Sequence, residues 1–180
     1  MSRIGVVAVP PRSRAAIREI AHLVRDVVKC TVPKFPIVEV LEHALPTLFP
    51  RYVLEICDFA EMGANHGLTY PEEWRIKIRE DIYERACDDE GRDRMTLAHE
   101  LGHLILHQKV AFARMPPDAT VPVYMDSEWQ ANCFGGELLM CARHVHRCRN
   151  ASEAERLFGV SSQAASTQWE AYKRDGIIEG

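Results

Sequence analysis

Two histidines and a glutamate in the segment MTLAHELGHLILH (95–107) have types and a spacing that suit a metal ion. His99 and His103 are four residues apart, so they lie on one face of a helix and both imidazoles can reach one ion. Glu100 projects beside them and can act as a general base toward a water molecule. The HExxH pattern therefore predicts a catalytic metal site. The alternative is a pair of core histidines that are satisfied by hydrogen bonds.

A third ligand is expected from the downstream segment DSEWQANCFGGELLM (126–140), because a catalytic zinc ion needs three protein ligands and one open position. Glu128 opens this expected helix and is the predicted third ligand, and Asp126 and Glu137 are its competitors. Glu137 also fits a solvated helix position. Asn132 lies one turn after Glu128 on the same face, where it could hydrogen-bond to a ligating histidine and fix its tautomer.

Three further residues are candidates for supporting roles. His107 lies one helical turn beyond His103, and three ligands spread over two turns of one helix converge poorly on a tetrahedral ion. We therefore expect His107 to support the ligands or the core. Tyr70, Tyr124 and His107 are candidates to donate a hydrogen bond to a developing oxyanion.

Hydrophobic periodicity predicts the elements that position these residues. Helices are expected at 13–28, from Pro36 to a stop at Pro46 and Pro50, and at 80–87, 95–107, 126–141, 151–158 and 161–174. Strands are expected at 52–57 and 74–79, with a turn flanked by Gly63 and Gly67, and residues 108–124 read as a long loop. The alternation within 74–79 suggests an edge strand that could pair with a substrate. Gly102 inside its helix suggests that another backbone passes close to it.

Composition limits the class of protein. The 180 residues are 47% apolar and 27% charged, which fits one globular domain made of N-terminal helices (1–50), a catalytic core (51–141) and a C-terminal helical segment (142–180). The formal net charge of -4 argues against a basic nucleic-acid-binding protein, so direct nucleic-acid binding is not expected. No apolar run is long enough for a membrane span or a signal-peptide core, so a cytoplasmic location with reduced thiols is expected.

A second group of candidate metal ligands lies at Cys141, His144, His146 and Cys148. Its spacing matches no common structural zinc pattern, so scattered surface histidines with buried or idle thiols are the favoured explanation. The residues that follow, 153–172, can be read as a helix-turn-helix or as two helices packed on the core. The helix-turn-helix reading would imply a small DNA-binding accessory protein, and the negative net charge disfavours that function.

The segments MTLAHELGHLILH and EWQANCFGGELLM, in this order and at this spacing, resemble the signature of the ImmA/IrrE family of metallopeptidases. SRAAIREIA and FGVSSQAA resemble that family's opening helix and C-terminal segment. The resemblance implies an α+β, zincin-like fold in which a small twisted sheet packs on the HExxH helix, with additional helices on the N- and C-terminal sides. It also implies a thermolysin-like site in which His99, His103 and Glu128 bind Zn²⁺ and Glu100 is the base.

The resemblance further implies a regulatory zinc endopeptidase that cleaves a protein partner, such as a helix-turn-helix repressor or an antitoxin. The alternative is a non-proteolytic, zinc-containing regulator that only binds such a partner. The intact Glu100 favours the enzyme, because a purely structural zinc site does not need it. The chain departs from the family pattern at Gln130, Gly135-Gly136 and Cys141, where an acidic residue, Ala-Ala and Pro are frequent. None of these departures removes a proposed ligand.

Overall fold

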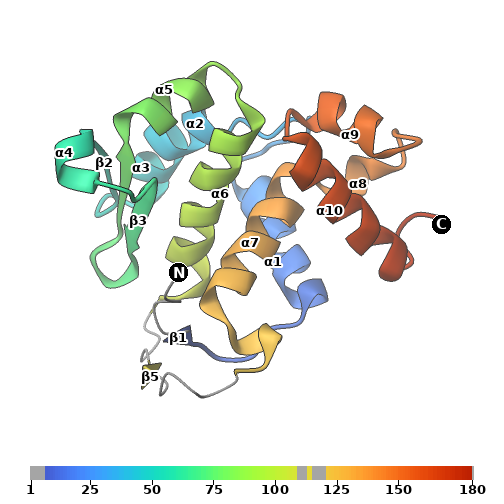
Figure 1. Cartoon of the computed structure of the whole chain (residues 1–180), viewed down its shortest axis with the longest axis horizontal. Helices are drawn as coiled ribbons and strands as arrows, with labels where there is room; N and C mark the ends of the chain where they lie inside the picture. The colour runs from blue at the N-terminus through green and yellow to red at the C-terminus, as the bar shows by residue number, and fades with distance from the viewer. Residues whose placement is uncertain (1–6, 109–112, 115–120, 180) are drawn as a thin grey trace.

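The structure, a computed structural model, describes residues 7–108, 113–114 and 121–179 and has an α+β fold (Figure 1). Its α-helices are α1 (Arg14–Val27), α2 (Ile37–Glu39), α3 (Leu45–Leu48), α4 (Phe59–Met62), α5 (Glu80–Cys87), α6 (Gly91–Leu106), α7 (Ser127–Leu139), α8 (Ala142–Val145), α9 (Ala151–Phe158) and α10 (Ser162–Arg174). Its strands are β1 (Val7–Ala8), β2 (Val53–Cys57), β3 (Gly67–Tyr70), β4 (Arg75–Arg79) and β5 (Ala113–Arg114). The predicted fold class, a small sheet packed on helices, is confirmed.

Helices α6 and α7 lie side by side at the centre of the molecule (Figure 1). A Cβ atom on Gly102 of α6 would lie 3.1 Å from both the Cα atom and the carbonyl oxygen of Ala131 on α7. The absence of a side chain at Gly102 therefore lets the two helix backbones approach, as its position in the sequence suggested. This close approach holds the two halves of the candidate site together.

The larger sheet has the strand order β2–β4–β3, with β4 parallel to β2 and antiparallel to β3. The expectation that residues 74–79 form an edge strand is therefore wrong, because β4 is paired on both sides. Alternation along β4 reports which side chains are buried, namely Ile76 and Ile78, and carries no information about the neighbouring strands. The edge strand beside α6 is β3, which the sequence analysis did not identify.

The segment that was expected to stop at Pro46 continues as a helix to Leu48. A π-helical turn, Val40–Ala44, joins α2 to α3, and Pro46 lies in the first turn of α3. Proline is tolerated in a first turn, because the N–H it lacks would have no partner within the helix. In the described part of the expected loop 108–124, β5 pairs with β1 and Val123–Met125 forms a 3₁₀ turn. None of the helices in the described ranges is long and apolar enough to cross a membrane.

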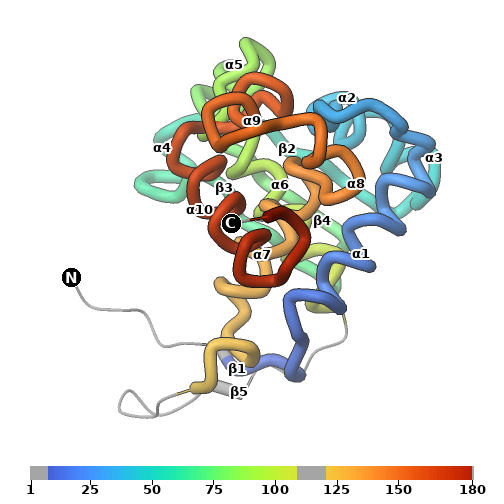
Figure 2. Tube along the Cα trace, turned by 90° about the vertical axis from the view of Figure 1, so that its right-hand side faces the viewer, coloured from blue at the N-terminus to red at the C-terminus, as the bar shows by residue number. Residues whose placement is uncertain are grey.

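Three helices meet at the buried carboxylate of Glu137. Glu137 on α7 accepts hydrogen bonds from Arg18 on α1 at 2.9 Å and from the hydroxyl of Tyr172 on α10 at 3.0 Å, and Arg14 lies 3.4 Å away. Its side chain is 0% exposed, so the reading of Glu137 as a solvated helix position is wrong. Helix α10 lies across α7 in the view of Figure 2. The hydrogen bond between Tyr172 and Glu137 connects these two helices.

Candidate metal centre

Side chains from α6 and α7 bring two imidazole nitrogens and a carboxylate together. The Nε2 atoms of His99 and His103 lie 3.0 Å apart. The carboxylate oxygens of Glu128 lie 3.3 Å from Nε2 of His99 and 3.2 Å from Nε2 of His103. One donor atom from each residue therefore lies within 4.8 Å of the others. The three residues that the sequence analysis selected as ligands share one small volume.

Asn132 of α7 orients the ring of His99. Its Nδ1 donates a hydrogen bond to Oδ1 of Asn132 at 3.0 Å, which leaves Nε2 directed toward Glu128. Burial alone lowers the pKa of His99, but the hydrogen bond to Glu128 and the charge of Glu100 outweigh burial and raise that pKa above its usual value. Hydrogen bonds from His103 and His99 lower the pKa of Glu128 well below its usual range. The carboxylate of Glu128 is therefore held in its charged form.

The ring of His103 is oriented by a second chain of contacts. Its Nδ1 lies 3.0 Å from Nδ1 of His107, and Nε2 of His107 lies 3.3 Å from Oε1 of Gln130. His107 is 1% exposed, and its burial lowers its pKa to about 4. Both ring nitrogens of His107 are engaged in this chain, so His107 is not available to donate to a substrate. Gln130 was noted in the sequence only as a departure from a family pattern.

Strand β3 holds the carboxylate of Glu100. The Oγ1 atom of Thr69 donates a hydrogen bond of 2.6 Å to Oε2 of Glu100, and it also lies 3.1 Å from the main-chain oxygen of Glu100. A Cβ atom on Gly67 would lie 2.5 Å from Cγ of Glu100, so only glycine leaves room for the side chain there. Neither Thr69 nor Gly67 was proposed from the sequence for this role. Their role follows from the placement of β3, which had no strong sequence signal.

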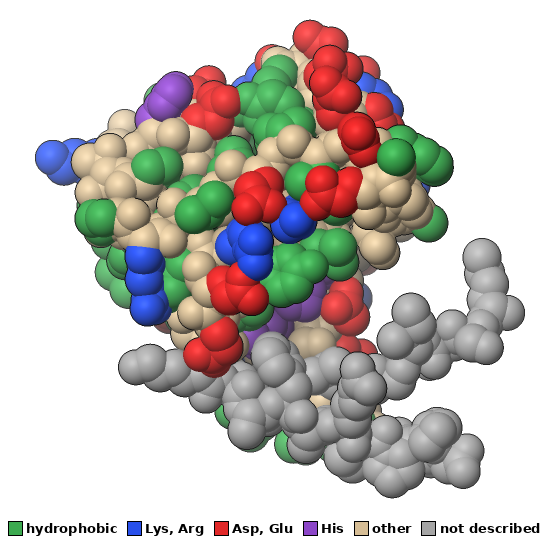
Figure 3. All heavy atoms as spheres, turned by 90° about the vertical axis from the view of Figure 1, so that its left-hand side faces the viewer, with side chains coloured by type: hydrophobic (Ala, Val, Ile, Leu, Met, Phe, Trp, Pro, Cys, Tyr) green, Lys and Arg blue, Asp and Glu red, His purple; other side chains and the backbone are tan. Residues whose placement is uncertain are grey.

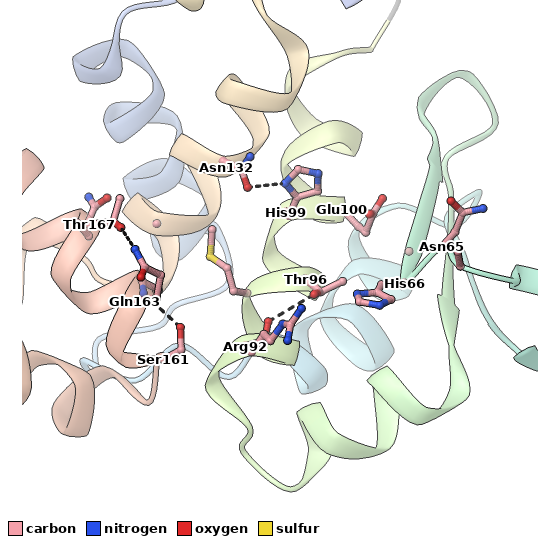
Figure 4. A pocket seen from close by; sticks show the side chains of 16 residues that line it. Asn65, His66, Arg92, Thr96, His99, Glu100, Asn132, Ser161, Gln163 and Thr167 are labelled. Atoms are coloured by element: carbon pink, nitrogen blue, oxygen red, sulfur yellow. Dashed lines mark hydrogen bonds between the residues drawn. The ribbon is translucent and has the colours of Figure 1, made fainter. Parts of the chain in front are cut away.

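Two cavities flank the cluster and share His99, Glu100 and Gly67. The larger, of about 640 Å³, lies between α6, α10 and the loop before β3, and is lined by residues that include His66, Arg92, Thr96 and Thr167 (Figure 4). The smaller, of about 500 Å³, lies over β3 and Glu128. His99 thus lines both cavities, whereas His103 and Glu128 line the smaller one. In the space-filling view, histidine side chains are recessed between acidic ones on this side of the molecule (Figure 3).

The remaining candidates take different positions. Tyr70 ends β3 and lines the smaller cavity, whereas Tyr124, whose side chain is exposed, lines neither cavity within the described part of the chain. Asp126 caps α7, since its Oδ1 accepts from the backbone N–H of Glu128 at 2.8 Å. Asp126 therefore holds the first turn of α7, which carries the predicted ligand Glu128. His66 lines the larger cavity beside Glu100 and was missed, because an isolated histidine before a glycine has no distinguishing spacing.

The other groups of ligating residues offer no comparable site. Within the described ranges, Cys141, His144, His146 and Cys148 do not converge on a common point. A second convergent group, Glu55, Cys57 and Glu61, surrounds Nζ of Lys77, which lies 3.0 Å from Glu55 and 2.6 Å from Glu61. A lysine ammonium therefore already neutralises that group.

Comparison with known families agrees with this architecture. A fold with an HExxH helix, a neighbouring carboxylate and an edge strand over the glutamate defines a metallopeptidase-like class. Residues 53–170 match the family described as the IrrE N-terminal-like domain, a peptidase family, and the chain belongs to it. No significant match was found among curated proteins or among solved structures. Family membership supports a metallopeptidase-type function, and such families are typically metal-dependent.

Proposed function

We propose that the chain is a zinc-dependent endopeptidase that hydrolyses a peptide bond in a partner protein. The observation that carries the proposal is the convergence of His99, His103 and Glu128 beside Glu100, next to two adjoining cavities. Two imidazoles and one carboxylate are the ligand set of a catalytic zinc site, which keeps one position open. The side chain of Glu128 is 65% exposed, so this side of the cluster is open to solvent and to a substrate.

The residues present fit a zinc ion. His99 uses Nδ1 to bind Asn132, so Nε2 is the nitrogen that remains for a ligand bond. The two facing Nε2 atoms at 3.0 Å and the adjacent carboxylate form a donor set of two imidazoles and one carboxylate. Zinc, when bound, would act as a Lewis acid that makes a water molecule more acidic and polarises the scissile carbonyl.

Glu100 is the proposed base. Thr69 occupies Oε2, so Oε1 of Glu100 is the atom available to take a proton from the attacking water. The water oxygen forms a bond to the carbonyl carbon, the C–N bond breaks, and Glu100 returns the proton to the leaving nitrogen. The hydroxyl of Tyr70 is the proposed donor to the developing oxyanion from the smaller cavity. Tyr124 would need a rearrangement to take that role, because its side chain lines neither cavity.

The edge of β3 opposite β4, which pairs with no other strand in the described part of the chain, is the proposed site for an extended substrate segment. Backbone N–H of Arg79 donates to the carbonyl of His66 at 3.0 Å, which makes these two residues a hydrogen-bonded pair of the β3–β4 ladder. Because such pairs alternate, the main-chain groups of Gly67 and Thr69 point away from β4. They can pair with a substrate strand next to Glu100, a role that the sequence analysis had assigned to residues 74–79.

The proposed substrate is a regulatory protein, such as a helix-turn-helix repressor or an antitoxin, and the proposed location is the cytoplasm. The support for this regulatory role is the family resemblance of the two motifs. The alternative function is a zinc-containing regulator that binds such a partner without cutting it. The two functions can be distinguished at Glu100, because only the peptidase needs this residue.

A cleavage assay with a matched variant tests the proposal. Zinc-loaded wild type and Glu100→Gln are incubated with a library of unstructured peptides, and the products are identified by mass spectrometry. We expect cleavage by the wild type, none by Glu100→Gln, and equal zinc content in both. Equal cleavage by both proteins would contradict the mechanism. Zinc binding without cleavage by the wild type would favour the non-proteolytic regulator.

A further inference from the structure

Gln130 is buried behind the candidate metal centre and lines neither of the two cavities beside it. We propose that Gln130 is a positioning residue for the candidate ligand His103. Acting through His107, it determines which ring nitrogen of each imidazole carries the proton, so that Nε2 of His103 presents a lone pair to the metal. This inference rests on the proposed metal site and adds a residue to it.

The orientation of the Gln130 amide is set by two main-chain carbonyls. Its Nε2 donates to the oxygen of Pro10 at 2.8 Å and to the oxygen of Tyr124 at 2.8 Å. A carbonyl oxygen can only accept, so both amide protons of Gln130 are used there. The reverse orientation would place three oxygen atoms against one another. Because Gln130 is 0% exposed, water cannot compensate for that arrangement.

The fixed amide dictates the tautomer of His107. Oε1 of Gln130 faces Nε2 of His107 at 3.3 Å, and an oxygen of this kind requires a proton on that nitrogen. A neutral imidazole has one N–H, so Nδ1 of His107 is left as an acceptor. It lies 3.0 Å from Nδ1 of His103, which must therefore carry its own proton and donate it.

The last link is the consequence for the ligand. With its Nδ1 protonated, neutral His103 has its lone pair on Nε2, the atom 3.2 Å from Glu128 and 3.0 Å from Nε2 of His99. The other tautomer would place an N–H where a metal must bind. Histidine ligands generally have such a partner on the second nitrogen, and its loss weakens metal binding. Here the partner is itself a histidine, His107, and Gln130 determines which ring nitrogen of His107 carries the proton.

The two carbonyls that orient Gln130 belong to segments that are joined by backbone hydrogen bonds. Backbone N–H of Val9 donates to the oxygen of Met125 at 2.9 Å, and that of Arg12 donates to the oxygen of Tyr124 at 3.0 Å. These bonds hold the two carbonyls that orient Gln130. The polarity of the chain is thus imposed by the backbone, which cannot change its hydrogen-bonding character, rather than by another side chain.

Ring-nitrogen NMR on the full chain tests the inference. The ¹⁵N-labelled protein is observed with and without zinc, at a pH where the free histidines are neutral, and zinc affinity is measured by competition with a chelator. We expect His107 of the wild type to carry its proton on Nε2 in both states. In Gln130→Met, which has a similar shape and no acceptor oxygen, we expect a mixture of His107 tautomers without zinc and about a 10-fold weaker zinc affinity.

Two further variants separate positioning from packing. Gln130→Glu keeps an acceptor toward His107, so it should restore the Nε2–H tautomer even if the protein is less stable. Gln168→Met is the matched control, because Gln168 is also buried (5% exposed) but lies on α10, where its Oε1 accepts from Arg14 at 3.4 Å rather than from a histidine. It should leave the tautomers and the zinc affinity unchanged.

The outcomes can be told apart. A proton on Nδ1 of His107 in the wild type would overturn the inference, whether or not zinc binds and whether or not any variant folds. Wild-type tautomers and wild-type zinc affinity in Gln130→Met would also overturn it. If zinc does not bind the wild type, the proposed function fails instead, and the tautomer of His107 still decides the inference.

Discussion

Thr69 donates a 2.6 Å hydrogen bond from Oγ1 to Oε2 of Glu100, which joins the edge strand of the sheet to the glutamate of the HExxH motif. The contact connects the proposed substrate-binding edge with the proposed base. Because Oε2 is occupied, the orientation of the carboxylate is defined before a substrate arrives. The strand that would bind the substrate thus also holds the group that would attack it through water.

Replacing Thr69 by valine should slow peptide cleavage without releasing zinc. Valine keeps the shape and the strand preference of threonine but has no hydroxyl to donate. Hydrogen bonds to charged groups contribute about 1.5–3 kcal/mol, so we expect kcat to fall at least about 10-fold. Thr69→Ser is the control and should retain most of the activity. An unchanged kcat in Thr69→Val would show that Glu100 does not need this contact.

Adding a single methyl group at Gly67 should displace the proposed base. A Cβ atom there would lie 2.5 Å from Cγ and 2.7 Å from Oε1 of Glu100, which is too close for a non-bonded methyl carbon. We expect Gly67→Ala to lose most peptidase activity and to keep its zinc content, since His99, His103 and Glu128 are not displaced. Wild-type cleavage rates in Gly67→Ala would contradict this role of the glycine.

Zinc content should depend on Glu128. Elemental mass spectrometry of the purified wild type should find about one zinc per chain, and Glu128→Ala should bind zinc much more weakly, because the third ligand is lost. Glu72→Ala is the matched control, since Glu72 lines the same cavity and is not part of the convergent group. Two zinc ions per chain would point to a second site elsewhere. Unchanged zinc binding in Glu128→Ala would exclude Glu128 as a ligand.

Glu137 should matter for stability rather than for catalysis. Its removal leaves Arg18 without its buried partner and removes one of the two acceptors of the Tyr172 hydroxyl, the other being the main-chain oxygen of Met140. Breaking a buried ion pair costs about 3–5 kcal/mol, so Glu137→Ala should lower the free energy of unfolding by roughly 3 kcal/mol in urea titrations. Glu153→Ala, which breaks an ion pair with the exposed Arg149, should have little effect. Equal losses in both variants would contradict the role of burial.

Cys133 should make the protein less stable at high pH. Burial raises the pKa of this thiol to about 12, whereas an unfolded cysteine titrates at about 8.5. Between these values the unfolded chain has lost the proton and the folded chain keeps it, so stability falls as pH rises. The wild type should lose more stability than Cys133→Ala across this range. A thiol reagent should modify exposed Cys87 first and Cys133 only on unfolding.

The residues whose roles were predicted from the sequence have roles that depend on local spacing. His99 and His103 are brought together by one turn of helix, and Asn132 is brought behind them by one turn of the next. Glu128 needed one further step, the packing of α7 on α6, which Gly102 indicated. For these residues the helical period was sufficient, because the contacts are made within or between two adjacent helices.

The residues that were missed have roles created by strand pairing and by distant main-chain atoms. Strand β3 is four residues long and begins at Gly67, so it has too few apolar positions to show a period. Gln130 acquires its orientation from Pro10, 120 positions away. The alternation in β4 identified its buried face correctly and could not reveal that strands lie on both sides of it.

The ion pairs of Glu137 have a consequence for how the protein can be divided. Its cationic partners, Arg14 and Arg18, belong to α1, whereas the region shared with the peptidase family begins at residue 53. A fragment trimmed to the shared region would lose both cations of Glu137 together with α1, which packs on α7 and covers this carboxylate. We therefore expect the recognisable segment alone to be less stable than the full chain.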